Sequence, residues 1–242
     1  MSQPIDPPAL ALRLRTADAH TVSRLITLIE NHDPDSLAAL QLLGTTPLAA
    51  RVIGITGYPG AGKSTLISRL VSAYRKQGRR VGVLAVDASS PFSGGALLGD
   101  RIRMQDHAGD PGVFIRSMAT RGHRGGLAET CPHIIRVLDA AGYEVILVET
   151  VGVGQNEIEI AGIVQTVVAV VAPGLGDEVQ AMKAGLLEIA HIVVVNKADR
   201  DPAGTTARDL QDWVPVVLQT IAINGEGIPE LVAAIEAHDH GV

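Results

Sequence analysis

Residues 57–65 read Gly57-Tyr58-Pro59-Gly60-Ala61-Gly62-Lys63-Ser64-Thr65, and they separate an apolar run, Arg51–Thr56, from an amphipathic run that begins at Leu66. The apolar run predicts a buried strand, and the amphipathic run predicts a helix. A Gly-x4-Gly-Lys-Ser loop between a strand and a helix is typical of a phosphate-binding P-loop. The alternative, a glycine-rich turn that binds nothing, is disfavoured because the motif is complete and stands in this context.

The residue types of this loop suit a nucleotide. Glycines let successive backbone N–H groups surround a phosphate chain, and the N-terminus of the following helix adds a partial positive charge. We expect Lys63 to reach the β- and γ-phosphates and the Ser64 hydroxyl to hold Mg²⁺. The nucleotide-binding residues predicted here are Gly57, Gly60, Ala61, Gly62, Lys63, Ser64 and Thr65.

The composition fits an α/β protein better than a nucleic-acid binder. At 242 residues the chain is long enough for one large α/β domain or two small ones. Hydrophobic residues make up 46% of the chain but aromatic residues only 2%, so the core must be built from Val, Ile, Leu and Ala. Such a core suits a buried parallel sheet. The formal net charge of −6, without any block of Lys and Arg, disfavours binding to nucleic acid.

Cysteine content and hydropathy favour a reducing compartment, the cytoplasm by default. Cys131 is the only cysteine, which excludes an intramolecular disulfide and a cysteine-based zinc ribbon. Residues 1–12 lack the basic start and long apolar stretch of a signal peptide. Since no apolar run approaches the roughly 20 residues of a membrane span, we expect no membrane association.

Two acids follow predicted strands at the edge where a nucleotide would bind. Asp87 closes the strand Val81–Val86, and Glu149 closes the strand Glu144–Glu149. Because ligands of doubly wound sheets lie beyond the carboxyl ends of the strands, we expect Asp87 and Glu149 to hold Mg²⁺ together with Ser64. The alternatives are an N-cap role for Asp87 and an ordinary strand-to-loop turn at Glu149.

Polar loops after the strands are candidates for nucleotide switches. Residues 89–99 predict a mobile loop that leads to Asp100, a candidate contact to the metal or to water. Its alternative role is to cap a short helix or to pair with Arg103. Further along, Gly152 can offer its N–H to the γ-phosphate. Gln155 is a candidate for positioning the attacking water, but it does not clearly match that role, so we expect slow intrinsic hydrolysis.

Asn196-Lys197-Ala198-Asp199 closes another predicted strand, His191–Val195, and has the sequence of a guanine-recognition motif. The Asp199 carboxylate can accept both the ring N1–H and the exocyclic amine of guanine, whereas adenine has an acceptor at N1. A site of this design can discriminate by a factor on the order of 10⁴. The motif is weak alone but strong at a strand end downstream of a P-loop. Backbone groups of Ile221 and Ala222, at the end of the predicted strand Pro215–Ala222, complete the expected base site.

The remaining pattern predicts a doubly wound α/β fold with a mainly parallel sheet. Further strands are expected at Val113–Met118 and Thr166–Val171, and a last helix is expected after Gly227. Ahead of the P-loop, Ala9–Glu30 and a segment that starts at Asp33-Pro34 and stops at Gly44 predict a helical hairpin. We therefore divide the chain into an N-terminal helical extension, residues 1–47, and a P-loop GTPase domain, residues 48–242.

These motifs together closely resemble those of the MeaB/ArgK family of P-loop GTPases, chaperones of adenosylcobalamin-dependent methylmalonyl-CoA mutase. The resemblance covers about residues 10–238 and rests on residues 57–65, 86–91, 99–104, 148–155 and 196–199. It implies a SIMIBI-like P-loop fold, GTP or GDP and Mg²⁺ as ligands, and metal-linked or switch roles for Asp87, Asp100 and Glu149. It also implies a switch loop at residues 177–183 that communicates with the mutase, and Gln180 and Lys183 match that loop.

Two departures from the family concern the C-terminal part of the chain. Family members usually carry a longer segment after the guanine motif and a helical C-terminal extension used in dimerisation. Here residues 200–213 are short and the sequence ends soon after His238. The family's mode of dimerisation is therefore not expected, and a homodimer is left as an open alternative.

The resulting expectation is a slow, Mg²⁺-dependent GTPase that acts as a switch and as a chaperone for such a mutase. The loop Gly174–Lys183 is predicted to serve the partner, with Lys183 stabilising charge that develops on the phosphates. In the alternative, Asp177 is only an N-cap and Lys183 a solvated helix residue. Alternatives for the whole protein are an ATPase or kinase of basic-amino-acid transport, a nickel metallochaperone GTPase, and a binding protein that never hydrolyses its nucleotide.

Overall fold

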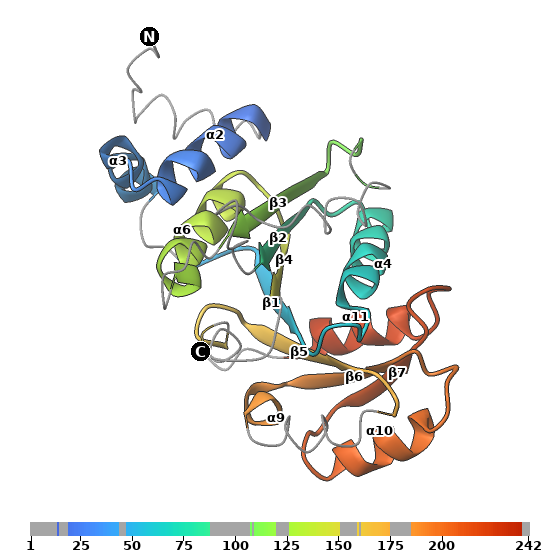
Figure 1. Ribbon diagram of the computed structural model, residues 1–242. Coiled ribbons are helices and arrows are strands. Elements are labelled where there is room, and N and C mark those ends of the chain that lie inside the picture. The colour runs from blue at the N-terminus through green and yellow to red at the C-terminus, as the bar shows by residue number, and fades with distance from the viewer. Residues whose placement is uncertain are drawn as a thin grey trace.

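The computed structural model describes residues 14, 19–43, 47–87, 107, 109–119, 126–150, 159, 161–174 and 185–238. Within them, a parallel sheet of seven strands forms the centre of the molecule, in the order β3-β2-β4-β1-β5-β6-β7 (Figure 1). The strands are β1 (Arg51–Thr56), β2 (Val81–Asp87), β3 (Val113–Ala119), β4 (Val145–Thr150), β5 (Thr166–Val171), β6 (Ile192–Asn196) and β7 (Val217–Thr220). The predicted doubly wound α/β fold is confirmed.

The central strands are buried on both faces, as their uninterrupted Val and Ile runs predict. Every residue of β4, β5 and β6 is buried, and so is every residue of β1 after Arg51. The edge strand β7 is only partly buried. Alternate residues of the central strands therefore point to opposite faces, where they join one hydrophobic cluster on the first face and two on the second.

Helices α4 (Lys63–Lys76) and α11 (Ile228–Ala237) cover one face of the sheet (Figure 1). The buried side of α4 carries the apolar residues that recur at helical spacing in the sequence, and they pack against β1 and β4. These residues are Leu66, Ile67, Leu70, Val71 and Tyr74. Because α4 begins directly at the P-loop, this packing fixes the loop to the sheet.

Helices α6 (Gly126–Ala140), α9 (Leu186–Ile189) and α10 (Ala203–Gln211) lie on the opposite face. Helix α6 covers β2, β4 and β1, while α9 and α10 cover β5 and β6. The sequence did not lead us to expect α6, which begins at a glycine and contains Pro132. Both residue types interrupt the helical pattern that a sequence shows.

The predicted helical hairpin is present as α2 (Ala19–Glu30) and α3 (Pro34–Leu43), and both helices pack on α6 (Figure 1). Asp33 precedes α3 and Pro34 opens it, as expected. The guanidinium of Arg116 in β3 pairs with Glu30 and donates to Thr27, both in α2. The hairpin therefore shares a hydrophobic cluster and an ion pair with the sheet. Most of residues 9–18 lie outside the described part of the chain.

Five predicted strands differ from the structure at their boundaries. The strands predicted to end at Val86 and Met118 end one residue later, and those predicted from Glu144 and His191 both start and end one residue later. The strand predicted over Pro215–Ala222 is only Val217–Thr220. Residues 221–226 instead form a turn closed by a bridge between Ile221 and Glu226.

No helix in the described part of the chain is long and apolar enough to cross a membrane.

Candidate nucleotide-binding site

The carboxyl ends of the parallel strands bring the predicted motifs to one edge of the sheet. In the register of β1 with β4, Ile55 lies beside Glu149, so this acid is next to the start of the P-loop. In the register of β6 with β7, Asn196 lies beside Thr220, so the guanine motif is next to the turn after β7. Strand β1 lies between β4 and β5, and the P-loop therefore stands between the two groups.

The P-loop requires glycine for two different reasons. Gly57 has φ 134°, and a Cβ there would lie 2.1 Å from the carbonyl oxygen of Val170 in β5. Gly62 has φ 97°, and its Cβ would lie 2.3 Å from the Asn196 amide nitrogen. Gly60 has φ 81° but faces open space. Gly57 and Gly62 thus allow close approach of the loop to β5 and β6. At Gly60, glycine is favoured only because the backbone has a positive φ.

Lys63 is the first residue of α4, and its side chain turns back over the loop. Its ammonium is buried and donates to the carbonyl oxygens of Gly57 at 2.6 Å and Tyr58 at 3.1 Å. The loop thus holds a positive charge beside the N-terminus of a 14-residue helix. Both favour the binding of an anion such as a phosphate chain.

Ser64 and Glu149 meet in the interior beside Lys63. The Ser64 hydroxyl donates to Glu149 Oε1 at 2.9 Å, and the two residues are only 7% and 1% exposed. A hydroxyl and a carboxylate are hard oxygen ligands of the kind that Mg²⁺ prefers. The donor set at this position therefore fits a magnesium ion.

Asn196 connects the phosphate and base sides of the site. Its amide nitrogen donates to the carbonyl oxygen of Ala61 in the P-loop at 2.9 Å. Its amide oxygen accepts hydrogen bonds from the Thr220 hydroxyl at 3.1 Å and from the Ala222 N–H at 3.0 Å. Lys197, with φ 59°, adds a hydrogen bond from its ammonium to Gly60 O at 2.6 Å. The motif thus ties the P-loop to the turn after β7.

The remaining predicted base contacts lie next to Asn196. Asp199 is exposed, so its carboxylate is accessible to a ligand. Ile221 and Ala222 follow β7 directly, and the carbonyl of the preceding Thr220 accepts a hydrogen bond from the Ala198 N–H at 3.0 Å. The structure therefore brings both segments of the expected base site together.

Comparison with known proteins identifies the family. Residues 22–242 match the family described as methylmalonyl-CoA mutase-associated GTPase MeaB. The chain belongs to this family. It is accordingly a P-loop GTPase that binds guanine nucleotides, as the sequence predicted.

Relatives of the MeaB family are similar over most of the chain. A Pyrococcus horikoshii protein, named as a GTPase only provisionally, is 51% identical and covers 98% of this chain and 78% of its own length. GTPase ArgK of Escherichia coli is 37% identical over 92% of this chain and 73% of its own. The mouse protein named methylmalonic aciduria type A homolog, mitochondrial, is 40% identical over 80% of this chain and 50% of its own.

Solved structures support the same fold. A crystal structure of an LAO/AO transport system kinase superposes with a TM-score of 0.77 at 28% identity, covering 97% of this chain and 76% of the other. The hydrogenase maturation factor HypB from Archaeoglobus fulgidus has a TM-score of 0.58 at 18% identity, covering 89% of this chain and 97% of the other. At that identity HypB shares the fold alone.

Several predicted site residues of this MeaB-family chain lie outside the described residues. These are Asp100, Gly152, Gln155 and Lys183, together with the predicted switch loop at residues 177–183. Asp87 is the last residue of β2, at the same sheet edge as Glu149, but its side chain is not described. Thr65 is an exposed residue of the first turn of α4.

Arg69 of α4 was not predicted to belong to the site. Its Nε donates to the carbonyl oxygen of Ala222 at 2.9 Å, and Nη2 donates to that of Ile223. In the sequence, Arg69 is one charged residue on the polar side of an amphipathic helix, a position usually occupied by solvated residues. Since its partners are more than 150 residues away in sequence, no local pattern could have indicated this contact.

Proposed function

We propose that this GTPase is a Mg²⁺-dependent switch and a chaperone of an adenosylcobalamin-dependent acyl-CoA mutase, such as methylmalonyl-CoA mutase. It would assist the loading or protection of the mutase's cobalamin. The description of the family names association with methylmalonyl-CoA mutase, and the mouse relative is named after methylmalonic aciduria. The main structural support for the proposed switch is the buried hydrogen bond between Ser64 and Glu149. These two residues are oxygen donors suited to Mg²⁺, and they lie beside Lys63, the proposed phosphate-binding lysine.

In this proposal, catalysis consists mainly of positioning and charge neutralisation. Lys63 and the N-terminus of α4 would hold the phosphates, and Asp199 with the turn after β7 would hold the guanine. Ser64, Glu149 and Asp87 would hold Mg²⁺, which when bound neutralises charge on the β- and γ-phosphates. We propose further that Asp100 contacts the metal or water and that Gly152 donates its N–H to the γ-phosphate. Gln155 is proposed to position the attacking water.

The mutase would act through the loop 174–183. In the proposal, binding of the partner brings Lys183 to the phosphates, where it stabilises developing negative charge as an arginine finger does elsewhere. Intrinsic hydrolysis is then slow and the mutase accelerates it.

We also propose the cytoplasm as the location, because the single cysteine, Cys131, cannot form an intramolecular disulfide. A homodimer is a further possibility that the proposal leaves open.

One rival function is that of the structurally similar LAO/AO transport system kinase. An ATP-dependent kinase would have to accept adenine at the base site. In the proposed base site, the carboxylate of Asp199 in Asn196-Lys197-Ala198-Asp199 would face the acceptor that adenine has at N1, and two acceptors facing each other are unfavourable. We therefore favour the GTP-dependent switch.

Phosphate release from GTP over many turnovers tests the proposed switch. We expect Lys63→Ala to abolish productive nucleotide binding, because it removes the buried positive charge from the loop. Glu149→Ala and Asp87→Ala should retain much of the nucleotide affinity but lose Mg²⁺-dependent hydrolysis. The matched control is Lys76→Ala, which removes an exposed lysine from the last residue of the same helix. Hydrolysis at the wild-type rate in both acid variants would refute the metal assignment.

The proposed partner is tested by the same assay with and without an adenosylcobalamin-dependent mutase. We expect the mutase to stimulate the wild type, and Lys183→Ala to lose most of that stimulation while it keeps its intrinsic rate. No stimulation of the wild type would contradict the chaperone proposal. Full stimulation of Lys183→Ala would contradict only the role of Lys183.

A further inference from the structure

The turn after β7, residues 221–226, is called the base loop here, because it includes the proposed backbone contacts to guanine. Hydrogen bonds close this loop on itself, from Ile221 N to Glu226 O at 3.1 Å and from Gly225 N to Ile221 O at 3.0 Å. Gly227, with φ 76°, allows the chain to pass close to β7, since a Cβ there would lie 2.2 Å from Gln219 O. The base loop is thus a compact unit at the end of the strand.

Side-chain packing holds this loop only weakly. Ile223, at its tip, is 76% exposed, while Ala222 is buried but small. A loop with an exposed tip must be fixed mainly by hydrogen bonds to its backbone. The orientation of the base loop therefore depends on the groups that bind its N–H and carbonyl groups.

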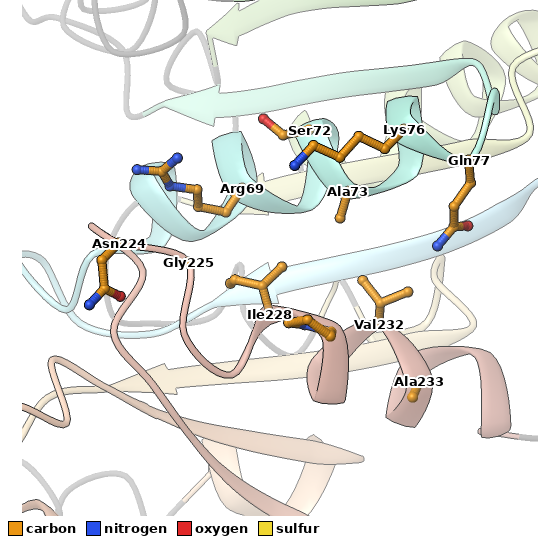
Figure 2. A pocket seen from close by; sticks show the side chains of 11 residues that line it. Arg69, Ser72, Ala73, Lys76, Gln77, Asn224, Gly225, Ile228, Val232 and Ala233 are labelled. Carbon is orange, nitrogen blue, oxygen red and sulfur yellow. The ribbon is translucent and has the colours of Figure 1, made fainter.

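Two such anchors hold the base loop from different elements. Asn196 of β6 accepts the Ala222 N–H at 3.0 Å. From α4, Arg69 donates Nε to Ala222 O at 2.9 Å and Nη2 to Ile223 O. Figure 2 shows the Arg69 side chain extending from α4 toward the segment that carries Asn224 and Gly225. Ala222 is therefore fixed at both its N–H and its carbonyl group.

The position of Arg69 on α4 links the two halves of the nucleotide site. It is six residues after Lys63, which corresponds to roughly 9 Å along the helix axis. The same rigid helix thus carries the lysine and serine of the phosphate side and the arginine that holds the base side. A planar guanidinium with two parallel donors fixes two successive carbonyls in one orientation, which a single ammonium cannot do.

We propose that Arg69 is a positioning residue for guanine recognition, which holds the base loop at a set distance from the P-loop. This inference rests on the proposed base site at Asp199 and the base loop. Without Arg69 the loop would occupy its binding-competent orientation only part of the time. The apparent affinity for guanine nucleotides would then fall to that fraction of its wild-type value, while contacts to the phosphates stay unchanged.

The surroundings of Arg69 make it suitable for substitution. It lines an open groove of about 690 Å³ between α4 and α11, together with small and polar residues such as Ala73 and Asn224 (Figure 2). Arg69 itself is exposed. Shortening its side chain therefore widens a solvent-facing groove and leaves the hydrophobic cluster below it intact.

The test compares dissociation constants for GDP and ADP, measured by competition titration, in the wild type, Arg69→Ala and Arg69→Lys. We expect Arg69→Ala to weaken GDP binding about tenfold, as for a loop that is competent about a tenth of the time, and to leave ADP binding unchanged. Arg69→Lys should be intermediate, because its ammonium reaches one carbonyl at a time. In hydrolysis, the KM for GTP should rise while kcat at saturation stays the same.

The matched control is Arg75→Ala, on the same helix. Arg75 also binds a backbone carbonyl, that of Arg79, and it pairs with Asp110, but it lies at the opposite end of α4 from the base loop. Its removal should leave the ratio of ADP to GDP dissociation constants unchanged. An unchanged ratio in Arg69→Ala, or an equal loss of GDP and ADP affinity, would overturn the proposal.

Two further outcomes are distinguishable. Equal affinity of the wild type for GDP and ADP would refute the proposed base site itself, and with it this role of Arg69. If Arg69→Ala does not fold, the ratio of ADP to GDP dissociation constants is measured in Arg69→Lys instead. This variant keeps the charge and the helix and removes only the paired donors. A wild-type ratio in that variant would then contradict the proposal.

Discussion

The Asn196 side chain joins three segments of the candidate site. Its amide oxygen and nitrogen contact the P-loop, β7 and the base loop at distances between 2.9 and 3.1 Å. A buried amide that satisfies three partners from different segments stabilises their relative positions. The first residue of the guanine motif therefore organises the site, whereas Asp199, at the end of the motif, is exposed and is the contact that we propose for the base.

A pair of glycine substitutions tests the proposed reasons for glycine in the P-loop. Gly57→Ala should destabilise the fold by about 3 kcal/mol or more, because its Cβ meets the backbone of β5 and cannot be accommodated by a rotamer change. Gly60→Ala should cost about 1 kcal/mol, because it adds only the strain of a positive φ. Urea unfolding of both variants gives the two values. Equal losses would show that the contact with Val170 is not the cause.

At the scale of single residues, local motifs were predictable and long-range contacts were not. The P-loop and the guanine motif are contiguous in sequence, so their chemistry could be inferred from residue types and spacing. The bonds from Asn196 to Ala61 and from Arg69 to Ala222 join residues 135 and 153 positions apart. Such residues meet because of the order of the strands in the sheet and the packing of α4 on it.

At the scale of elements, Asp110 joins the C-terminal end of α4 to the turn before β3. It accepts Nε of Arg75 at 2.9 Å, Nη2 of Arg75 at 3.0 Å and the Gly112 N–H at 2.8 Å. These contacts, the Arg75 guanidinium first and the Gly112 N–H second, hold the pKa of the Asp110 carboxyl below its usual value of 3.8. The carboxylate is therefore favoured in the folded state.

This pKa shift predicts how stability depends on pH. A carboxyl whose pKa is lowered by folding stabilises the fold above its unfolded pKa, here 3.8, and loses that contribution as pH falls through the lower folded value. The difference in free energy of unfolding between wild type and Asp110→Asn should thus be constant from pH 7 to about pH 5 and shrink below pH 4. Urea unfolding across this range measures it. A difference that persists unchanged at pH 3 would contradict the assignment.

Removal of a carboxylate elsewhere serves as the control for this measurement. Asp212, the C-cap of α10, is exposed, and Asp212→Asn removes the same charge without touching the contact to Arg75. A similar change in both variants would point to a general effect of net charge rather than to the contact with Arg75.

Elements with clear periodicity were predictable from sequence, and those interrupted by glycine or proline were not. The strands β1 to β6 were expected within one residue of their ends, and helix α4 was expected to begin at Leu66, three residues after its actual start at Lys63. Helix α6 was missed because Gly126 and Pro132 conceal its pattern, although Ile134, Ile135 and Leu138 are buried. The predicted end of β7 was wrong because Ile221 and Ala222 have strand-like apolar character but turn back to pair with Glu226.

At the scale of the whole molecule, the hydrophobic residues that stabilise the fold are separate from the residues of the candidate site. Three hydrophobic clusters on the two faces of the sheet hold the helices, while the described residues of the candidate site collect at one edge. The hairpin α2–α3 extends the cluster on α6, away from that edge (Figure 1). Buried Cys131 belongs to this same cluster, and burial raises the pKa of its thiol to about 12, which suits a packing role rather than a reactive one.

We propose that this edge of the sheet recognises guanine through Asp199 and the base loop while α4 holds the phosphates. The most direct measurement is a calorimetric titration of the wild type and Asp199→Asn with GDP, ADP and XDP in the presence of Mg²⁺. We expect the wild type to bind GDP more tightly than ADP by a factor on the order of 10⁴. Asp199→Asn should shift the preference from GDP to XDP, because the substitution replaces an acceptor by a donor. Equal affinity of the wild type for GDP and ADP would contradict recognition of guanine at this edge.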